Sequence, residues 1–394
     1  MLIGAVPRVG VLCFSPFGAS NGMAVRVRAM VEDLHALGID LHIIAVGDGQ
    51  PSSPTLGVPP GAVVTEVRPR GRAGFVTQVA RELAKVSRSL DALVIEGAMF
   101  VPAVVLARVP CPLIWDIVEL ETLHYRRIRR TTPGVYTRHG IWYALELWAG
   151  RKASVVVAVS AAEATECQRL LPSTHGKVRV VSHRVPLPDL PGGELSNGPT
   201  PPREPTAGAR ARAVFVGDLA AKHNRDAANW ILRDLVPRLP GGYEIVFIGP
   251  GSDALPGGNM AGSTVRGLGV VPELATVVGS GDIALAPLAA GAGVKTKMLD
   301  YLALGCRVLA TPVALEGLDG APGVKRCSLA DFARAFDALA RSSEPEDTRT
   351  CRVEAQRSWL LAHTSPQLTR AAWRDVLRDV GLTSGPASTG SGSE

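Results

Sequence analysis

Residues 291–318 read GAGVKTKMLDYLALGCRVLATPVALEGL, and this stretch decides the fold of the surrounding chain. An apolar, β-rich segment at 282–288 runs into two glycines. After the glycines, Leu299, Leu302 and Ala303 recur at helical spacing. The order of strand, glycine loop and helix predicts one Rossmann-like unit of a parallel sheet.

The loop and the helix start have the properties of a diphosphate site. Gly291 and Gly293 permit tight turns and close approach of a ligand to the backbone. The backbone N–H groups of Val294, Lys295 and Thr296 are expected at the positive end of the helix dipole. We therefore expect this loop to bind phosphate groups.

Two charged side chains follow on the same helix. Lys297 and Asp300 are three residues apart and so share one helix face. That face offers a cation to phosphate and a carboxylate to hydroxyl groups. The alternative interpretation is an ordinary exposed ion pair on a Rossmann helix, worth a few tenths of a kcal/mol.

Short β-rich runs alternate with helix-like runs over most of the chain, which predicts parallel sheets covered on both faces. The alternation stops at 186–208, a Pro- and Gly-rich stretch that we interpret as an interdomain linker. It then restarts, with a helix expected over 272–278, and continues into the phosphate loop. Two such sheets are expected to face a central cleft at their carboxyl edges. The polar tail at 381–394 is expected to be disordered.

The composition of the 394 residues excludes fibrous and disordered classes, because 46% of them are hydrophobic. Six scattered cysteines, without a CxxC pair or metal-ligand spacing, predict a reduced, cytoplasmic protein that holds no metal. The first residues read as a buried strand rather than a signal peptide, and no segment reaches the length of a membrane span. The Gly-, Ala- and Arg-rich usage resembles that of high-GC bacteria.

Basic residues gather at one place in the first half. Arg126, Arg127, Arg129 and Arg130 follow Tyr125. This cluster suits peripheral contact with an anionic inner-membrane face or with an acidic acceptor. The alternative is a solvated helix face beside core aromatics. Nucleic-acid binding is not expected, because the chain has no nucleic-acid-binding signature and its net charge of +6 is modest.

The opening stretch resembles the retaining, nucleotide-sugar-dependent glycosyltransferases of family 4. In that family a glycine loop precedes Lys or Arg, Lys-x-x-Glu, a glycine, a strand, Thr and Glu-Gly-Leu. The matching residues here are Gly293, Lys295, Lys297, Asp300, Gly305, Val308, Leu309, Ala310, Thr311, Glu316, Gly317 and Leu318. The resemblance implies a GT-B fold, with an acceptor domain over 1–185, a donor domain over 209–362 and a helix over 363–380 that returns to the first domain.

The resemblance also implies roles for single residues. The loop amides bind the donor diphosphate and Asp300 binds the ribose. Gly217 and Lys222 approach the donor phosphates, and Lys222 and Lys297 stabilise the departing diphosphate. The nucleobase lies against the strand ends, around Gly249 and Val270, and Gly22 lies in the first loop near donor and acceptor.

Acidic residues follow a strand of the first domain. Asp116 ends the strand PLIWD, and Glu119 follows beside Val118, which occupies the place of a histidine in many relatives. Both carboxylates are expected to accept hydrogen bonds from acceptor or donor hydroxyls, and one of them is a candidate catalytic base.

These observations predict a hexosyltransferase that moves sugar from UDP- or GDP-sugar to a hydroxyl-bearing small molecule, lipid or glycan, with retention of configuration. No cofactor is expected, since lysines and helix amides bind the diphosphate. Two alternatives stay open: a GT-B sugar-nucleotide epimerase or hydrolase, and a non-catalytic accessory relative. The second alternative rests on Ala292, Asp218 and Val118, which depart from the family pattern.

Overall fold

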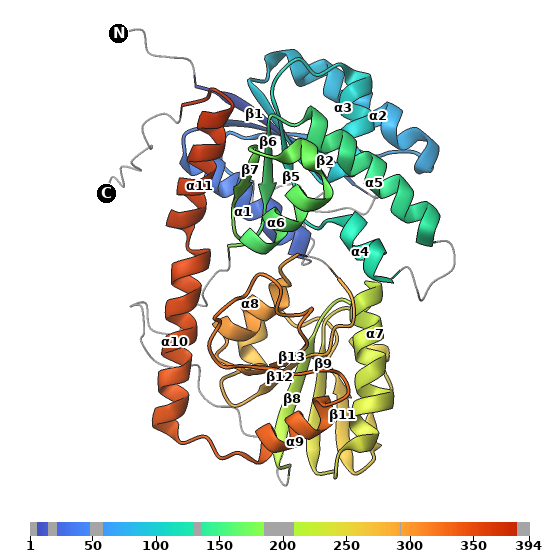
Figure 1. The fold of residues 1–394 in the computed structure, drawn as a ribbon, viewed down its shortest axis with the longest axis vertical. Coiled ribbons are helices and arrows are strands. Elements are labelled where there is room, and N and C mark those ends of the chain that lie inside the picture. The colour runs from blue at the N-terminus through green and yellow to red at the C-terminus, as the bar shows by residue number, and fades with distance from the viewer. Residues whose placement is uncertain are drawn as a thin grey trace. The chain divides into compact units, whose positions relative to one another are not determined.

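The computed structural model describes residues 6–14, 22–47, 58–128, 135–184, 209–291 and 293–383. The chain divides into two compact units, each with its own sheet (Figure 1). The first unit runs up to Arg184 and resumes at Pro366, and the second runs from Val185 to Ser365. The expected linker at 186–208 and most of the expected tail lie outside the described residues.

The first unit contains a parallel sheet in the order β3-β2-β1-β4-β5-β6-β7. Its strands are β1 (Arg8–Phe14), β2 (Asp40–Val46), β3 (Val63–Val67), β4 (Ala92–Glu96), β5 (Leu113–Asp116), β6 (Val155–Ala158) and β7 (Val178–Val180). Its helices are α1 (Gly22–Ala36), α2 (Gly71–Val86), α3 (Val101–Ala107), α4 (Glu121–Ile128), α5 (Val135–Lys152), α6 (Ala161–Leu170) and α11 (Pro366–Asp379). This is the strand order of a Rossmann sheet.

The second unit has the same winding, in the order β10-β11-β9-β8-β12-β13-β14. Its strands are β8 (Ala211–Val216), β9 (Tyr243–Ile248), β10 (Gly258–Met260), β11 (Ser263–Gly267), β12 (Ile283–Ala286), β13 (Arg307–Ala310) and β14 (Val324–Arg326). Its helices are α7 (Lys222–Trp230), α8 (Thr296–Ala303), α9 (Phe332–Arg341) and α10 (Glu346–Thr364). All pairs are parallel except β10 with β11. The predicted fold class of two Rossmann-like, doubly wound sheets is confirmed.

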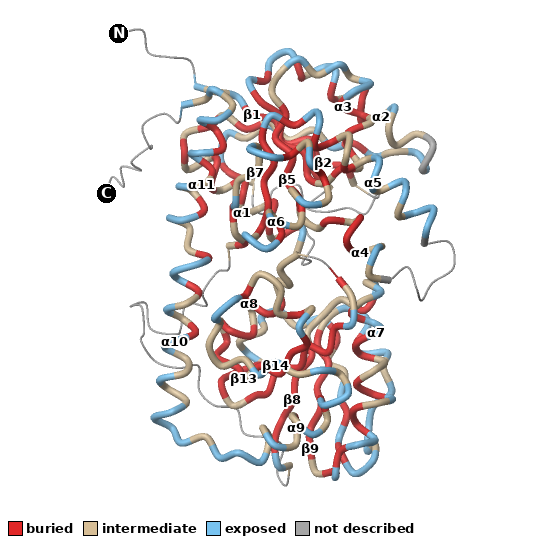
Figure 2. Tube along the Cα trace, viewed as in Figure 1, coloured by how far each residue is buried: buried red, intermediate tan, exposed pale blue. Residues whose placement is uncertain are grey.

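The cores follow from the composition of the strands. The strands β4, β6, β9 and β12 are buried along their whole length. Figure 2 shows buried segments in red inside both units. A parallel sheet covered by helices on both faces requires such continuous apolar runs. The apolar runs of the sequence therefore identify the inner strands of both units.

One expected helix is absent. The sequence suggested a helix over 272–278, but the structure has only a 3-10 turn at Leu274–Thr276. The β-branched residues from Thr276 to Val278 disfavour a helix. The Arg212 guanidinium also donates a hydrogen bond to the carbonyl of Val277 (2.9 Å), so this carbonyl is used outside a helix.

Each sheet has one point where the strand order reverses. In the first sheet it lies between β1 and β4, and in the second between β8 and β12. Loops leaving the carboxyl ends of these strands diverge to opposite faces, which opens a place for ligands. The phosphate loop predicted from the sequence follows β12 and therefore begins at such a point.

Helix α11 packs into the core of the first unit. Trp373 on α11 is 2% exposed and packs in the core of the first unit with Val376 and Leu377. Trp373→Ala is expected to lower the free energy of unfolding by about 3–5 kcal/mol, because it leaves a large cavity. Leu368→Ala, on the exposed side of the same helix, is the control for urea denaturation. Equal effects of the two variants would contradict this packing.

Candidate functional site

The turn after β8 is built by close backbone contact. A Cβ atom on Gly249 would lie 2.4 Å from the carbonyl oxygen of Gly217, and Gly249 has a φ of +123°. Only glycine permits this approach of the β8 and β9 ends. The two glycines predicted from the sequence therefore lie together at the carboxyl edge of the second sheet.

The loop before α8 presents the start of that helix. Gly291 and Gly293 have φ values of +139° and +67°, in the region that favours glycine. The Lys295 ammonium donates to the carbonyl of Gly293 (2.6 Å), which closes the loop. Thr296 begins the helix, whose first N–H groups have no intrahelical acceptor. Ala292 lies outside the described residues.

Helix α8 is fixed to the sheet by a buried tyrosine. The hydroxyl of Tyr301 accepts a hydrogen bond from the backbone N–H of Val216 at the end of β8 (2.8 Å). Met298, Leu299 and Leu302 bury the same side of the helix. The start of α8 is thereby held beside the Gly217 turn, at the reversal point of the second sheet.

Lys297 is buried at this place, with 9% of its surface exposed. Its ammonium lies 4.4 Å from the centre of the Phe215 ring and donates a hydrogen bond to Asn224 Oδ1. Burial, with a smaller contribution from Lys295, lowers the pKa of Lys297 to about 7. Binding of an anionic ligand would stabilise the charged form of Lys297, because few nearby charges offset the cost of its burial.

Asp300 lies one helical turn further along α8. Burial raises the pKa of its carboxyl to about 6, although the nearby Lys297 opposes the shift. Lys297 and Asp300 therefore lie close enough for the charge of each to affect the pKa of the other, and Lys297 is buried rather than solvated. This differs from the solvated ion pair that was the alternative interpretation of the sequence.

Two residues that were predicted to contact the nucleotide-sugar donor are exposed. Lys222 begins α7, and its ammonium forms an ion pair with Asp226 on the same helix (2.5 Å), with 63% of the lysine side chain exposed. Lys222 is thus paired with a residue of its own helix and not with the groups around Lys297. The catalytic role of Lys222 remains a prediction. Val270 follows Gly269 after β11 and is 67% exposed, which leaves an apolar surface available at the strand ends.

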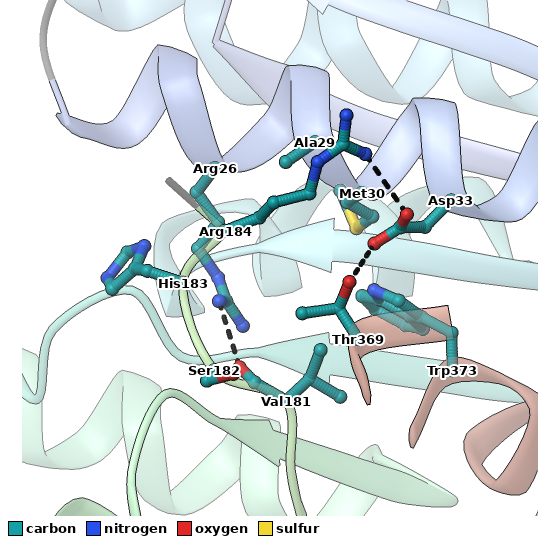
Figure 3. A pocket seen from close by; sticks show the side chains of 10 residues that line it. All are labelled: Arg26, Ala29, Met30, Asp33, Val181, Ser182, His183, Arg184, Thr369 and Trp373. Atoms are coloured by element: carbon teal, nitrogen blue, oxygen red, sulfur yellow. Dashed lines mark hydrogen bonds and ion pairs between the residues drawn. The ribbon is translucent and has the colours of Figure 1, made fainter. Parts of the chain in front are cut away.

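Asp116 does not have the environment of a catalytic base. Its carboxylate is fully buried, and Arg26 on α1 binds both oxygens, with Nε at 2.8 Å from Oδ2. Arg26 also donates to the carbonyl of Val181 (3.1 Å), an interaction drawn in Figure 3. A carboxylate held in this way is a structural partner of Arg26, a contact that does not favour its use as a base, and the catalytic role of Asp116 stays a prediction.

Two buried glutamates near Asp116 were given no site role from the sequence. Glu96 ends β4 and accepts from the backbone N–H of Phe14 (3.1 Å), while Glu163 accepts from that of Val159 (3.0 Å). In each, Oε1 has no hydrogen-bond partner among the residues that the structure describes. Burial, with the charge of Asp116, raises the pKa of Glu96 to about 8, and burial raises that of Glu163 to about 8. The position of Glu96 at the end of an apolar strand is the feature by which the sequence could have identified it as a candidate.

The remaining first-unit candidates lie on or beside α1 and α4. Glu119 lies between β5 and α4, and its Oε1 is 3.3 Å from His124 Nδ1. Gly22 is the first residue of α1. Arg126 and Arg127 lie in the last turn of α4, whereas Arg129 and Arg130 lie outside the described residues.

A small hollow of the first unit is organised by Asp33 on α1 (Figure 3). Arg184 donates to its Oδ1 at 3.1 Å, and Thr369 on α11 donates to its Oδ2. One carboxylate therefore holds both the last residue of the first segment and the first turn of the returning helix. Side chains fill this hollow, and nothing in its lining marks it as a ligand site.

No group of three or more His, Cys, Asp or Glu side chains within the described ranges is arranged to hold a metal ion. All six cysteines are unpaired. Among the helices of the described chain, none is long and apolar enough to cross a bilayer.

Family models match both halves of the chain. Residues 20–187 match the model described as Glycosyltransferase Family 4, and residues 210–342 match the model described as Glycosyl transferases group 1. No curated protein sequence matches the chain significantly. With the two Rossmann-like sheets, these matches show that the chain is a GT-B glycosyltransferase.

Solved structures share this fold. Sucrose-phosphate synthase from Thermosynechococcus elongatus has a TM-score of 0.73 at 13% identity, covering 95% of this chain and 99% of that one. A glycosyltransferase from Rickettsia africae has a TM-score of 0.66 at 12% identity, covering 96% and 99%. Anabaena HepE, in complex with UDP-glucose, has a TM-score of 0.63 at 12% identity, covering 94% and 99%.

The Glu96 carboxyl makes folding stability depend on pH. Its pKa rises from 4.5 to about 8 on folding, so the folded protein binds this proton more tightly. The resulting stabilisation is complete below pH 4.5 and is lost as the pH rises toward 8. Glu96→Gln is therefore expected to change stability little at pH 5 and to raise the unfolding free energy by roughly 1–3 kcal/mol at pH 9.

Chemical denaturation at both pH values measures this effect, and the exposed Glu354→Gln is the matched control. A gain for Glu96→Gln that is equal at pH 5 and pH 9 would show that Glu96 is not protonated in the folded protein.

Proposed function

We propose that the protein transfers a hexose from UDP- or GDP-sugar to a hydroxyl group of a small molecule, lipid or glycan, with retention of configuration. The observation that carries the donor part is the buried Lys297 ammonium at the start of α8, beside the Gly217 turn. A cation and free helix amides at a sheet reversal point suit a diphosphate. Retention is proposed from the Lys-x-x-Asp pattern, which resembles that of retaining enzymes.

The donor is oriented by three parts of the second unit in this proposal. The amides of Val294, Lys295 and Thr296 bind the diphosphate, Asp300 accepts from the ribose hydroxyls, and the nucleobase lies against Val270 and the Gly249 turn. UDP-glucose in the structure of Anabaena HepE favours UDP as the first nucleotide to test.

The reaction needs no protein nucleophile. The bond between the sugar C1 and the β-phosphate oxygen breaks, and the electron pair leaves with the diphosphate. The acceptor oxygen attacks C1 from the same face, and its proton passes to the departing phosphate. Lys297 stabilises the charge that develops on the diphosphate, which is the largest contribution expected in such catalysis. In the first unit, Glu119 and the start of α1 at Gly22 are proposed to contact the acceptor.

One pair of assays separates this function from its alternatives. Thermal shift with UDP, GDP and their sugars tests the donor site, and nucleotide release with and without acceptors tests transfer. Release that does not require an acceptor would favour an epimerase or hydrolase. Stabilisation by nucleotide without any turnover would favour a non-catalytic relative, and no stabilisation by any nucleotide would reject the donor site.

Substitution of the buried lysine tests the chemistry. Lys297→Ala is expected to lower kcat/KM for the donor by about 100- to 1,000-fold, because one charge-stabilising donor is lost. Lys325→Ala, which removes an exposed lysine of the same unit, is the control and is expected to leave kcat/KM unchanged. Transfer by a folded Lys297→Ala protein at the parental rate would reject the assigned role.

A second proposal concerns peripheral contact of the first unit with the inner, cytoplasmic face of an anionic membrane. Helix α5 has three exposed apolar side chains, Tyr136, Ile141 and Tyr143, which are 69%, 56% and 38% exposed. Arg138 on the same helix and Arg126 on α4, which packs against α5, are also exposed. Exposed aromatic and aliphatic side chains bordered by arginines favour an interface with anionic headgroups.

Vesicle sedimentation tests this surface. Replacing Arg126 and Arg138 with Ser is expected to weaken binding to phosphatidylglycerol vesicles roughly tenfold or more, since each surface arginine contributes about 1 kcal/mol. Replacing the exposed Arg334 and Arg341 with Ser is the charge-matched control. Equal binding of the parent protein to phosphatidylglycerol and phosphatidylcholine vesicles would contradict the proposal.

A further inference from the structure

Asn224, in the first turn of α7, is in contact with the proposed donor site and was not among the residues predicted from the sequence. It is 7% exposed. Its Oδ1 accepts a hydrogen bond from the Lys297 ammonium, and its Nδ2 donates to the carbonyl oxygen of Asp218 (3.0 Å). These two bonds fix the amide, because a flipped amide would place both of its ends against groups of the wrong kind.

The surroundings of the Lys297 ammonium leave it one protein acceptor. Within the described part of the chain, Asn224 Oδ1 is its only hydrogen-bond acceptor. The Phe215 ring lies on one side at 4.4 Å, and a Cβ atom on Gly217 would come within 3.0 Å of Nζ. An ammonium has three N–H donors, so two remain for a ligand.

We propose that Asn224 is a positioning residue, whose amide oxygen fixes the direction of the Lys297 ammonium and leaves its two other N–H groups for the donor diphosphate. This inference rests on the donor site of the proposed function. Asn224 acts through Lys297 and need not touch the nucleotide.

A neutral acceptor suits this place better than a charged one. Burial already disfavours the cationic form of Lys297, and Lys295 adds to that effect, whereas Asp300 opposes it. A hydrogen bond from an amide oxygen stabilises the ammonium without cancelling its charge. A carboxylate at position 224 would instead form an ion pair and compete with phosphate for the cation.

Two variants separate positioning from a merely structural role. The pKa of Lys297 is measured by NMR of lysine labelled at Cε, without nucleotide, with Lys297→Arg used to assign the signal. Asn224→Asp is expected to raise this pKa by about 1–3, and Asn224→Ala to lower it. Both variants are expected to weaken UDP binding, Asn224→Ala by about 10- to 100-fold, as for loss of a hydrogen bond to a charged group.

The control is Asn259→Ala, at an exposed asparagine of the same unit, which is expected to change neither quantity. The isosteric Asn224→Asp keeps the test valid if the alanine variant does not fold. An unchanged Lys297 pKa in a folded Asn224→Asp protein, or UDP binding by that variant at parental affinity, overturns the positioning role. Failure of the parent protein to bind UDP and GDP overturns the donor site and, with it, the positioning role.

Discussion

The structure of the second unit depends on the burial of one cation, the Lys297 ammonium. Burial of a lysine to 9% exposure beside an aromatic ring is costly. In the described chain the Asn224 oxygen is the only hydrogen-bond acceptor of this ammonium, and the charge of Asp300 offsets part of the cost. The surrounding parts make this burial possible: Gly217 leaves the space, and Tyr301 fixes α8 to the end of β8. A site of this kind has unfavourable charge energy until an anion binds, which is the basis of the donor-site proposal.

Much of the fold was predictable because parallel sheets buried on both faces require continuous apolar strands. Such runs identify β4, β6, β9 and β12 directly. The edge strands were not predictable in the same way. β10 reads GNM and β14 reads VKR, and both are largely exposed, so no apolar pattern marks them. The short 3-10 turn in place of a helix at 272–278 reflects a tertiary contact from Arg212, which local sequence does not reveal.

The candidate site was predictable only where neighbours in the sequence create it. The glycines before α8 and the spacing of Lys297 and Asp300 are local features, and the structure places them at the start of one helix. The partners of these residues are distant: Asn224 is 73 residues from Lys297, and Arg26 is 90 residues from Asp116. For that reason neither the pairing of Asn224 with Lys297 nor that of Arg26 with Asp116 could be predicted from the sequence.

A crystal structure of the protein with UDP or GDP bound tests the central claim most directly. The account predicts that oxygens of the diphosphate lie within about 3.2 Å of the Lys297 ammonium and of amide nitrogens in the segment 294–296. Lys297 would keep its hydrogen bond to Asn224 in that complex. An ordered diphosphate bound elsewhere in the protein, without contact to Lys297 or to the start of α8, would contradict the account.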